Sequence, residues 1–566
     1  MSTIQISEPK EPRSELTNRT ATSDSNPLQR ATPALVFLIA MVYLCLFRRF
    51  STRDLDEGII LQAAERVLRG QVPYRDFFIF YTPGSFYLQA AMFKVFGDSL
   101  AVARTGIAFV GAACSAVTYC LARRVCSRKI SLLAAALTVG FSVTYRFVVV
   151  HNWYSTFFTS LAIYAAVRLL ESGKKSWAFL TGSLATLTVL VEQSKGPALY
   201  GGLALGYIIL LAARRRALPT SSSIVAFAFG SIWPWAPTLL YFASKHSITV
   251  MLQDWFWPLH HYTQANHVFY GHLSLAEDVR NSLYTGALWV KIWRYVTLSP
   301  LLVIPVLPLV GVVWLIFSVK RLWTNKHSSP ETAYYVLIGA IGFGLLLSIL
   351  IVRTDITDFV YLAPIWYVVL AWTLRERESK YTLLQKLRPY LLVYICIAFG
   401  MMSFALLLSV NGAPVRTHTR RGVVETTNEE TVIPFVQARV PPGHELFVYP
   451  YLPLYNYLTA THNPTPLDYF QAGMNTQEQA QNMIETLRRR RTRWVLFDPE
   501  FIGRIPYVWP HTPMAAIASD PVADFIADHY RVCQVLSAGP GLLFHFMVLK
   551  DENCIPLPPT LSSITQ

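Results

Sequence analysis

Runs of mainly apolar residues alternate with short polar segments over residues 31–410 of the chain. About 20 apolar residues in an α-helix cross the hydrocarbon core of a bilayer. The runs lie at 31–47, 105–122, 130–145, 152–167, 176–191, 196–213, 217–244, 297–319, 333–352, 359–374 and 389–410. They predict a polytopic α-helical membrane domain with about eleven transmembrane helices. Residues 1–30 are rich in Ser, Thr, Pro and charged residues, which predicts a disordered tail.

The pattern changes after residue 411, where short apolar strands alternate with amphipathic helices. Residues 445–449 and 494–497 read as strands, and 476–490 as a helix with apolar Met483, Ile484 and Leu487. A short helix at 522–529 precedes two further strands near 530–536 and 542–549. Residues 411–566 are therefore expected to form a soluble α/β domain, with a small sheet covered on at least one face.

Composition supports a membrane protein and excludes a purely soluble one. Hydrophobic residues make up 53% of the chain and charged residues only 15%, with a mean hydropathy of +0.35. Soluble domains carry about 25% charged residues. The same composition excludes intrinsic disorder as the main character of the chain.

The net charge of +15 is explained by one set of alternating loops. That set holds about eighteen Lys and Arg residues, whereas the opposite short loops hold Arg146, Lys195 and Arg353. The basic residues are Arg123, Arg124, Arg128, Lys129, Arg168, Lys174, Lys175, Arg214, Arg215, Arg216, Lys320, Arg321, Lys326, Arg375, Arg377, Lys380, Lys386 and Arg388. Basic short loops face the cytoplasm. The charge thus reports orientation in a cytoplasmic (inner) membrane and gives no reason to expect a nucleic-acid partner.

This orientation places the tail 1–30 in the cytoplasm and three segments outside it. The outward segments are the long loops 48–104 and 245–296 and the C-terminal domain 411–566. Of the seven cysteines, Cys533 and Cys554 both fall in the outward domain, where a disulfide between them is one alternative. The cysteines show no spacing typical of a metal site.

The first outward loop begins with the acidic segment Asp54-Leu55-Asp56-Glu57 and continues as an amphipathic helix. A helix lying at the membrane surface would hold these carboxylates at the boundary between water and lipid. There Asp56 could take a proton from a hydroxyl nucleophile. The alternative is a structural role, because Asp54 and Glu57 have the spacing of a helix-capping pair.

Other polar residues on the outward side are candidate ligands. Arg75 could bind a phosphate or carboxylate, or could simply pair with Asp76. The isolated cations Lys195 and Arg353 need partners near the membrane plane, and a lipid phosphate, Glu192 or Asp355 would each serve.

Histidines follow an aromatic segment in the second outward loop. His260 and His261 come directly after Trp255, Trp257 and their neighbours, which favours an interfacial segment that contacts sugar or lipid headgroups. Metal binding is the less favoured alternative, because no HExxH motif or Cys/His framework is present. A requirement for a divalent metal stays open.

At these motifs the chain resembles a known family. Asp54–Gly58, Val67–Gly70, Pro73–Phe78, Tyr81–Gly84 and Phe96–Leu100 are similar to segments of the large GT-C glycosyltransferase class. The similarity is greatest to bacterial members related to protein O-mannosyltransferases and the lipid A aminoarabinose transferase.

The resemblance implies an enzyme that moves a sugar from a polyprenyl-phosphate carrier to a hydroxyl acceptor on a lipid, glycan or protein. It implies inversion in one displacement, with Asp56 as general base and Glu57 beside it. Arg75, Lys195 and Arg353 would stabilise the leaving phosphate, and Tyr81, His260 and His261 would line the substrate site. One departure is that some relatives carry a Glu/His-Lys-Pro-Pro stretch where this chain has Tyr81-Thr82-Pro83-Gly84.

The alternative to an enzyme is a transporter or flippase of lipid-linked sugars. A transporter would be expected to carry ionisable residues near the middle of its spans. In this sequence the polar residues gather at the outward ends of the spans, which favours an active site there. No phosphate-binding motif of an ATP-driven transporter occurs in a usable context.

Overall fold

The computed structural model describes residues 27–50, 54–213, 219–273, 277–324, 329–376, 382–412, 415–539 and 542–554. Most of the predicted tail, residues 1–26, lies outside these ranges. The same is true of part of the basic set, namely Arg214, Arg215, Arg216, Lys326, Arg377 and Lys380.

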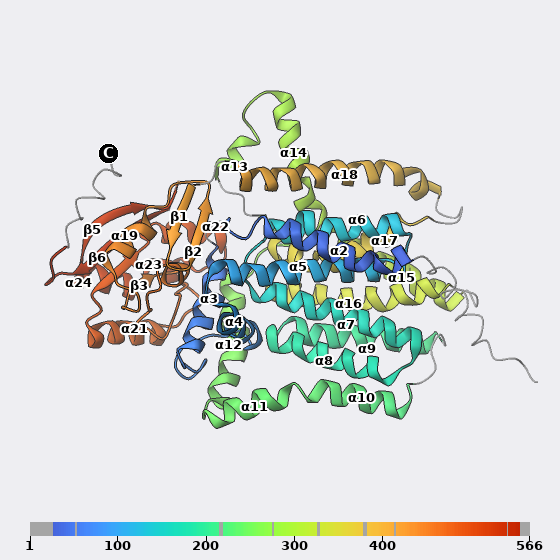
Figure 1. Cartoon of the computed structure of the whole chain (residues 1–566), viewed down its shortest axis with the longest axis horizontal. Helices are drawn as coiled ribbons and strands as arrows, with labels where there is room; N and C mark the ends of the chain where they lie inside the picture. The colour runs from blue at the N-terminus through green and yellow to red at the C-terminus, as the bar shows by residue number, and fades with distance from the viewer. Residues whose placement is uncertain are drawn as a thin grey trace, which may run out of the picture.

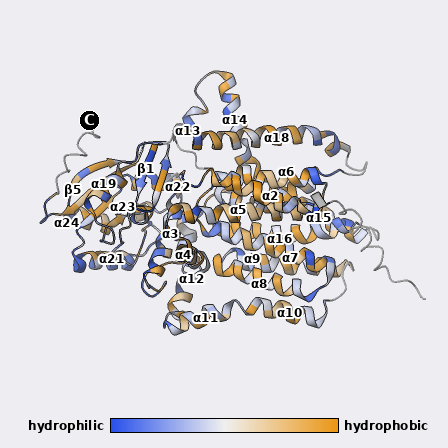
Figure 2. Ribbon diagram, viewed as in Figure 1, coloured by the Kyte–Doolittle hydropathy of each residue, from blue (hydrophilic) through white to orange (hydrophobic). Residues whose placement is uncertain are grey.

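Long helices run side by side and form a bundle, with the C-terminal region at one end (Figure 1). The bundle contains α2 (Pro27–Cys45), α5 (Leu100–Ala122), α6 (Arg128–Leu137) with the π-helical turn η1 (Thr138–Val143), α7 (His151–Ser172), α8 (Lys175–Val191), α9 (Lys195–Ala212), α10 (Ser221–Ile232), α11 (Trp235–Ser244), α15 (Val306–Thr324), α16 (Pro330–Val352), α17 (Ile356–Leu374) and α18 (Thr382–Asn411). Figure 2 shows that apolar residues dominate these helices along their length.

The bundle confirms a polytopic membrane fold. Seven helices among the described residues are long and apolar enough to cross a bilayer, and Arg30–Cys45 and Lys175–Val191 are shorter apolar helices. Each predicted apolar run overlaps one or two helices of the described residues, although the total of eleven spans stays a prediction. The first helix begins at Pro27, inside the segment predicted to be disordered.

Two predicted spans are divided in the structure. The run 217–244 is divided between α10 and α11, with a break at Trp233 and Pro234. The run 297–319 is divided between α14 (Leu288–Val303) and α15, with a break at Ile304 and Pro305. Proline lacks the amide hydrogen that would continue the helix, so the chain turns at this point.

Close helix contacts in the bundle depend on small residues. A Cβ atom added at Gly202 of α9 would lie 2.5 Å from the Cα atom of Ile341 in α16. One added at Gly344 of α16 would lie 2.4 Å from the carbonyl oxygen of Ala198 in α9. Only glycine allows these two backbones to approach so closely, which is a common device in membrane helices.

Three further helices lie between the bundle and the C-terminal region: α3 (Leu55–Leu68), α4 (Gly84–Phe96) and α12 (Ile248–Asn266) (Figure 1). We call the end of the bundle that faces the C-terminal region the domain end. The turns that carry Arg146, Lys195 and Arg353 open at the domain end, because α7, α9 and α17 begin there. The short helix α13 (Glu277–Ser282) and α14 form a hairpin that projects beside α18.

The C-terminal region is an α/β unit, as predicted. Its main sheet has the order β3-β4-β6-β5, in which β3 and β4 are parallel and the other pairs are antiparallel. The elements are β1 (Val415–Thr419), β2 (Gly422–Thr426), α19 (Val432–Arg439), β3 (Phe447–Tyr449), α20 (Leu454–Leu458), α21 (Gln477–Arg490), β4 (Trp494–Phe497), α22 (Phe501–Val508), α23 (Met514–Ala518), α24 (Pro521–His529), β5 (Tyr530–Ser537) and β6 (Leu543–Leu549). Cys533 and Cys554 form a disulfide, with their Cα atoms 5.6 Å apart.

Ion pairs attach the C-terminal region to the first loop. Arg66 of α3 donates to Asp468 across 2.7 Å and to the carbonyl oxygen of Thr465 across 2.8 Å, and both charged side chains are buried. Arg421 pairs with Glu65 of α3 and with Asp98. Since a buried charge is tolerated only when it is paired, these contacts fix how the region sits on α3.

Candidate active site

Asp54 occupies the N-terminal cap of α3. Its Oδ1 atom accepts hydrogen bonds from the backbone amides of Asp56 and Glu57, at 3.1 and 3.3 Å. Its Oδ2 atom lies 2.7 Å from Nη1 of Arg146, which comes from the turn before α7. Asp54 therefore has the capping role that its position in the sequence suggests, and it also neutralises a cation.

Asp56 is the second residue of α3. Its carboxylate has no hydrogen-bond partner in the described parts of the chain. Burial, followed by the negative charge of Asp54, raises the pKa of Asp56 to about 6. The positive charges of Arg146 and Arg353 act in the opposite direction. A partly buried carboxylate with a pKa near neutrality can accept a proton from a hydroxyl group.

Glu57 has a different environment from its neighbour. It is fully buried, and Arg104 of α5 binds both its carboxylate oxygens, at 2.8 and 2.5 Å. The backbone amide of Val149 donates a third hydrogen bond to Oε1, at 3.1 Å. The geometry is that of a structural ion pair that joins α3 to α5.

Lys195 and Arg353 are both paired with the acidic residues that were the alternatives to a lipid phosphate. The Nζ atom of Lys195 lies 2.9 Å from Glu192 and 3.1 Å from Oγ of Ser155. The Nε atom of Arg353 lies 2.5 Å from Asp355. Of the two cations, Arg353 is the one whose charge acts directly on Asp56.

Arg353 also connects the bundle to the C-terminal region. Its Nη2 atom donates to the carbonyl oxygen of Val508, at the end of α22, across 2.8 Å. Its Nη1 atom lies 3.5 Å from the side-chain oxygen of Asn266 in α12. Three segments that are far apart in the sequence therefore meet around this guanidinium.

Arg75 pairs with its sequence neighbour. It makes two contacts with Asp76, of 2.8 and 2.9 Å, and its side chain is about half exposed. The sequence left two roles open for Arg75, and the structure shows the ion pair with Asp76. The hydrogen bond from Arg75 lowers the pKa of Asp76.

The two histidines lie on α12 among aromatic residues. His260 is exposed, and the His261 ring stacks on Trp257 with the ring centres 4.4 Å apart. Across the described residues, no group of three or more His, Cys, Asp or Glu side chains is arranged to hold a metal ion. No chemical step is therefore assigned to a metal, and the requirement for a divalent metal stays open.

Tyr81 is part of an aromatic surface within electrostatic range of Asp56. Its ring centre is 4.2 Å from that of His151 and 4.5 Å from that of Phe80. Burial, and next the charge of Asp56, raises the pKa of Tyr81 above its usual range. The same two causes raise the pKa of Tyr451, which comes from the C-terminal region.

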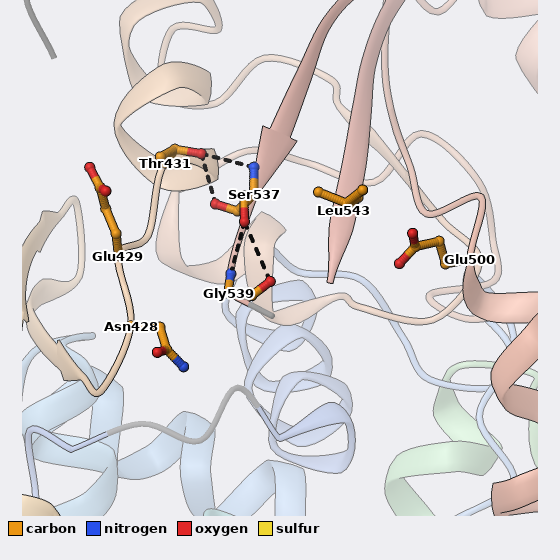
Figure 3. A pocket seen from close by; sticks show the side chains of 7 residues that line it. All are labelled: Asn428, Glu429, Thr431, Glu500, Ser537, Gly539 and Leu543. Atoms are coloured by element: carbon orange, nitrogen blue, oxygen red, sulfur yellow. Dashed lines mark hydrogen bonds between the residues drawn. The ribbon is translucent and has the colours of Figure 1, made fainter. Parts of the chain in front are cut away.

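A separate hollow opens in the C-terminal region (Figure 3). Its volume is about 470 Å³, and it is lined by Asn428, Glu429, Thr431, Glu500, Ser537, Gly539 and Leu543. The hydroxyl of Thr431 donates to the carbonyl oxygen of Ser537 across 2.7 Å and accepts from its amide across 3.1 Å. None of the residues around Asp56 lines this hollow.

Comparison with known proteins identifies the fold. Residues 81–241 match the family model described as Dolichyl-phosphate-mannose-protein mannosyltransferase. ArnT from Cupriavidus metallidurans bound to undecaprenyl phosphate aligns with a TM-score of 0.51 and 12% identity, over 92% of this chain and 98% of that one. The fold is that of the GT-C membrane glycosyltransferases.

Two other structures align at somewhat lower scores. The apo state of the same ArnT gives a TM-score of 0.47 with 12% identity, over 92% of this chain and 98% of that one. The archaeal oligosaccharyltransferase AglB from Archaeoglobus fulgidus, in complex with an inhibitory peptide and a dolichol-phosphate, gives 0.49 with 10% identity, over 94% and 76%. No curated protein sequence matches the chain.

The family match covers only part of the candidate site. Its range, 81–241, includes Tyr81 and Lys195 but leaves out Asp56 and Arg353. The assignment of Asp56 therefore depends on the geometry around it and on the resemblance of the first loop.

Sequence reasoning did not select four residues that lie within electrostatic range of Asp56, namely Arg146, Tyr262, Tyr451 and Tyr469. Arg146 could have been selected, because it is the isolated cation of its turn in the same way as Lys195 and Arg353. Tyr451 and Tyr469 carry no comparable signal, since aromatic residues in a soluble domain are usually core residues. Only the docking of the C-terminal region brings them near Asp56.

Proposed function

We propose that this protein transfers a sugar from a polyprenyl-phosphate carrier to a hydroxyl acceptor at the outer face of the cytoplasmic membrane, with inversion at the anomeric carbon. The observation that carries the proposal is the Asp56 carboxylate. It is partly buried, has no hydrogen-bond partner among the described residues, and has a pKa of about 6 beside two arginines. The GT-C fold supports the reaction class.

In the proposed step, Asp56 acts as general base. Its carboxylate takes the proton of the acceptor hydroxyl while the hydroxyl oxygen attacks the anomeric carbon of the donor sugar. The bond between that carbon and the phosphate oxygen breaks on the opposite face, and polyprenyl phosphate leaves with the bonding electron pair. Glu57 takes no part in this step, because Arg104 holds both its oxygens.

The leaving phosphate requires positive charge and hydrogen-bond donors. Arg353 is the best placed of the predicted cations, because its charge acts on Asp56 and its guanidinium is partly exposed. Arg146 is a second candidate, with its charge partly offset by Asp54. Lys195 is almost fully buried between Glu192 and Ser155. We therefore assign it a structural role, in which it stabilises the turn between α8 and α9.

Two observations support an outward-facing site. The turns that carry Asp54, Arg146 and Arg353 open at the domain end, whereas the basic turns lie at the other end of the bundle. Positive loops mark the cytoplasmic side of membrane proteins. The Cys533–Cys554 disulfide in the C-terminal region suits an oxidising compartment outside the cytoplasm.

The proposal is tested by sugar transfer in membranes that contain the full-length protein. Radiolabelled sugars on undecaprenyl phosphate are supplied, and wild type is compared with Asp56→Asn. We expect the Asn variant to lose at least about 100-fold in rate, as is typical when a general base is removed. Glu485→Gln, an exposed acidic residue on α21, is the matched control and should keep the wild-type rate.

Two results would count against the proposal. Transfer at an unchanged rate by Asp56→Asn would remove Asp56 from the base role. Failure of wild type to transfer from any carrier, together with carrier-dependent movement of lipid-linked sugar across the bilayer, would favour the flippase alternative.

A further inference from the structure

Four tyrosines lie within electrostatic range of Asp56, and their hydroxyl groups make no hydrogen bond to any described residue. They are Tyr81 in the first loop, Tyr262 in α12, and Tyr451 and Tyr469 in the C-terminal region. The charge of Asp56 acts on the phenol group of each one. Hydroxyls left without partners near the proposed catalytic carboxylate are available to a ligand.

Tyr469 is the most informative of the four. Its side chain is 4% exposed, and its hydroxyl is a buried polar group without a partner. The Oδ2 atom of Asp254 in α12 is also buried without a partner, and the charge of Asp254 acts on Tyr469. Buried polar groups are normally satisfied, so the unpartnered hydroxyl of Tyr469 is open to a hydrogen bond with a bound molecule.

The rings form one continuous aromatic surface. The ring centres of Tyr451 and Tyr469 are 5.3 Å apart, and Tyr469 is 6.4 Å from Phe80. Phe80 in turn stacks on Trp257 at 5.7 Å, with 16° between the ring planes. Aromatic faces bordered by hydroxyl and carboxylate groups match the chemistry of a sugar ring, which has apolar C–H faces and a rim of hydroxyls.

The two tyrosines of the C-terminal region are held rigidly. Tyr451 follows β3 and stacks on Phe501 at 5.6 Å, with 18° between the planes. Tyr469 directly follows Asp468, which is tied to Arg66 of α3 by the buried ion pair of 2.7 Å. Since Asp56 stands at the start of the same helix α3, this contact fixes Tyr469 relative to the proposed base.

We propose that Tyr451 and Tyr469 form one wall of the sugar subsite and bind hydroxyl groups of the transferred sugar. The C-terminal region thereby determines which sugar is accepted. This inference rests on the proposed transferase function and assigns a role in it to the C-terminal region. It predicts that the phenol hydroxyls act on sugar selectivity and leave the basicity of Asp56 unchanged.

The test uses the full-length protein in detergent and four forms of it: wild type, Tyr451→Phe, Tyr469→Phe and Tyr449→Phe. Tyr449 is the matched control, because its hydroxyl bonds to Asp520 inside the C-terminal region at 2.7 and 2.8 Å. The donor is whichever of undecaprenyl-phosphoryl glucose, galactose, mannose or arabinose wild type uses fastest. A series of deoxy analogues of that donor, each lacking one sugar hydroxyl, completes a double-mutant cycle.

We expect Tyr469→Phe and Tyr451→Phe to lower kcat/KM for the intact donor by roughly 3- to 10-fold, the loss of one hydrogen bond. One deoxy donor lacks the sugar hydroxyl that the tyrosine binds. With that donor, wild type and the Phe variant should react at the same rate, because the hydrogen bond is already lost. Tyr449→Phe should keep the wild-type sensitivity to every deoxy donor.

Three outcomes would overturn the inference while leaving the transferase function intact. The first is that the losses in kcat/KM from the Phe variant and from the missing sugar hydroxyl add up for every deoxy donor. The second is that Tyr449→Phe loses as much kcat/KM as Tyr451→Phe and Tyr469→Phe. The third is a shift of the pH profile without a change in donor selectivity. A wild-type protein that neither transfers from nor binds any of the four donors, with binding measured by titration calorimetry, would overturn both proposals.

Discussion

The Nη1 atom of Arg146 lies 2.7 Å from Oδ2 of Asp54, and this ion pair borders the proposed catalytic base. Asp54 raises the pKa of Asp56, whereas Arg146 lowers it. With these two charges opposed, burial is the largest influence on Asp56, and the pKa reaches about 6. The pair thus brings two distant segments together, and its opposed charges leave the pKa of the proposed base close to neutral pH.

The pH dependence of transfer should follow the ionisation of Asp56. The general base must be deprotonated, so kcat/KM should rise with pH through about 6 and level off above 7. The rate is measured between pH 5 and 8 with the acceptor well below its KM. A rate that is flat across this range would contradict the assignment of Asp56 as base.

Replacing Arg146 should move this profile. In Arg146→Gln a positive charge that lowers the pKa of Asp56 is lost, so the acidic limb should shift to higher pH. Transfer should therefore fall more at pH 6 than at pH 8. Arg146→Lys keeps the charge and should show the smaller shift of the two variants.

Glu57→Gln should affect stability more than chemistry. The change leaves the buried Arg104 guanidinium without its counter-charge, which typically costs about 3–5 kcal/mol. Thermal unfolding in detergent, followed by tryptophan fluorescence, should show a lower Tm. The double variant Glu57→Leu with Arg104→Met should recover part of the loss, because it removes both buried charges.

Asp254 should make the folded state less stable as pH rises. Burial raises its pKa to about 7, so the folded protein holds a proton there that the unfolded chain releases near pH 4. The folded state therefore loses stability between about pH 4 and pH 7, by at most about 4 kcal/mol. Asp254→Asn should raise Tm most at pH 8 and least near pH 4, whereas the exposed control Glu485→Gln should show no such trend.

The predicted orientation can be checked with thiol labelling. Asn428→Cys places a thiol on the C-terminal region, and Ser172→Cys places one at the exposed last residue of α7, at the opposite end of the bundle. An impermeant maleimide should label the first variant in intact spheroplasts and the second only after lysis. The reverse pattern would contradict an outward-facing C-terminal region.

Much of the fold was predictable because its signals are local. Runs of apolar residues locate the bundle helices, and alternation after residue 411 locates β4 and β6 and the helix α21. The predicted bounds of a span were wrong where a proline divided an apolar run, as between α14 and α15. A hydropathy run shows that a segment is apolar but does not show where the helix breaks.

The sequence by itself determined which residues lie at the ends of the spans and which loops carry the charge. It could not show that Asp56 and Glu57, two adjacent carboxylates on α3, have different surroundings. Successive residues of an α-helix point about 100° apart, so two neighbours cannot share one environment. Tertiary packing decided the difference, because α5 brought Arg104 to Glu57 while the aromatic surface and the C-terminal region closed around Asp56.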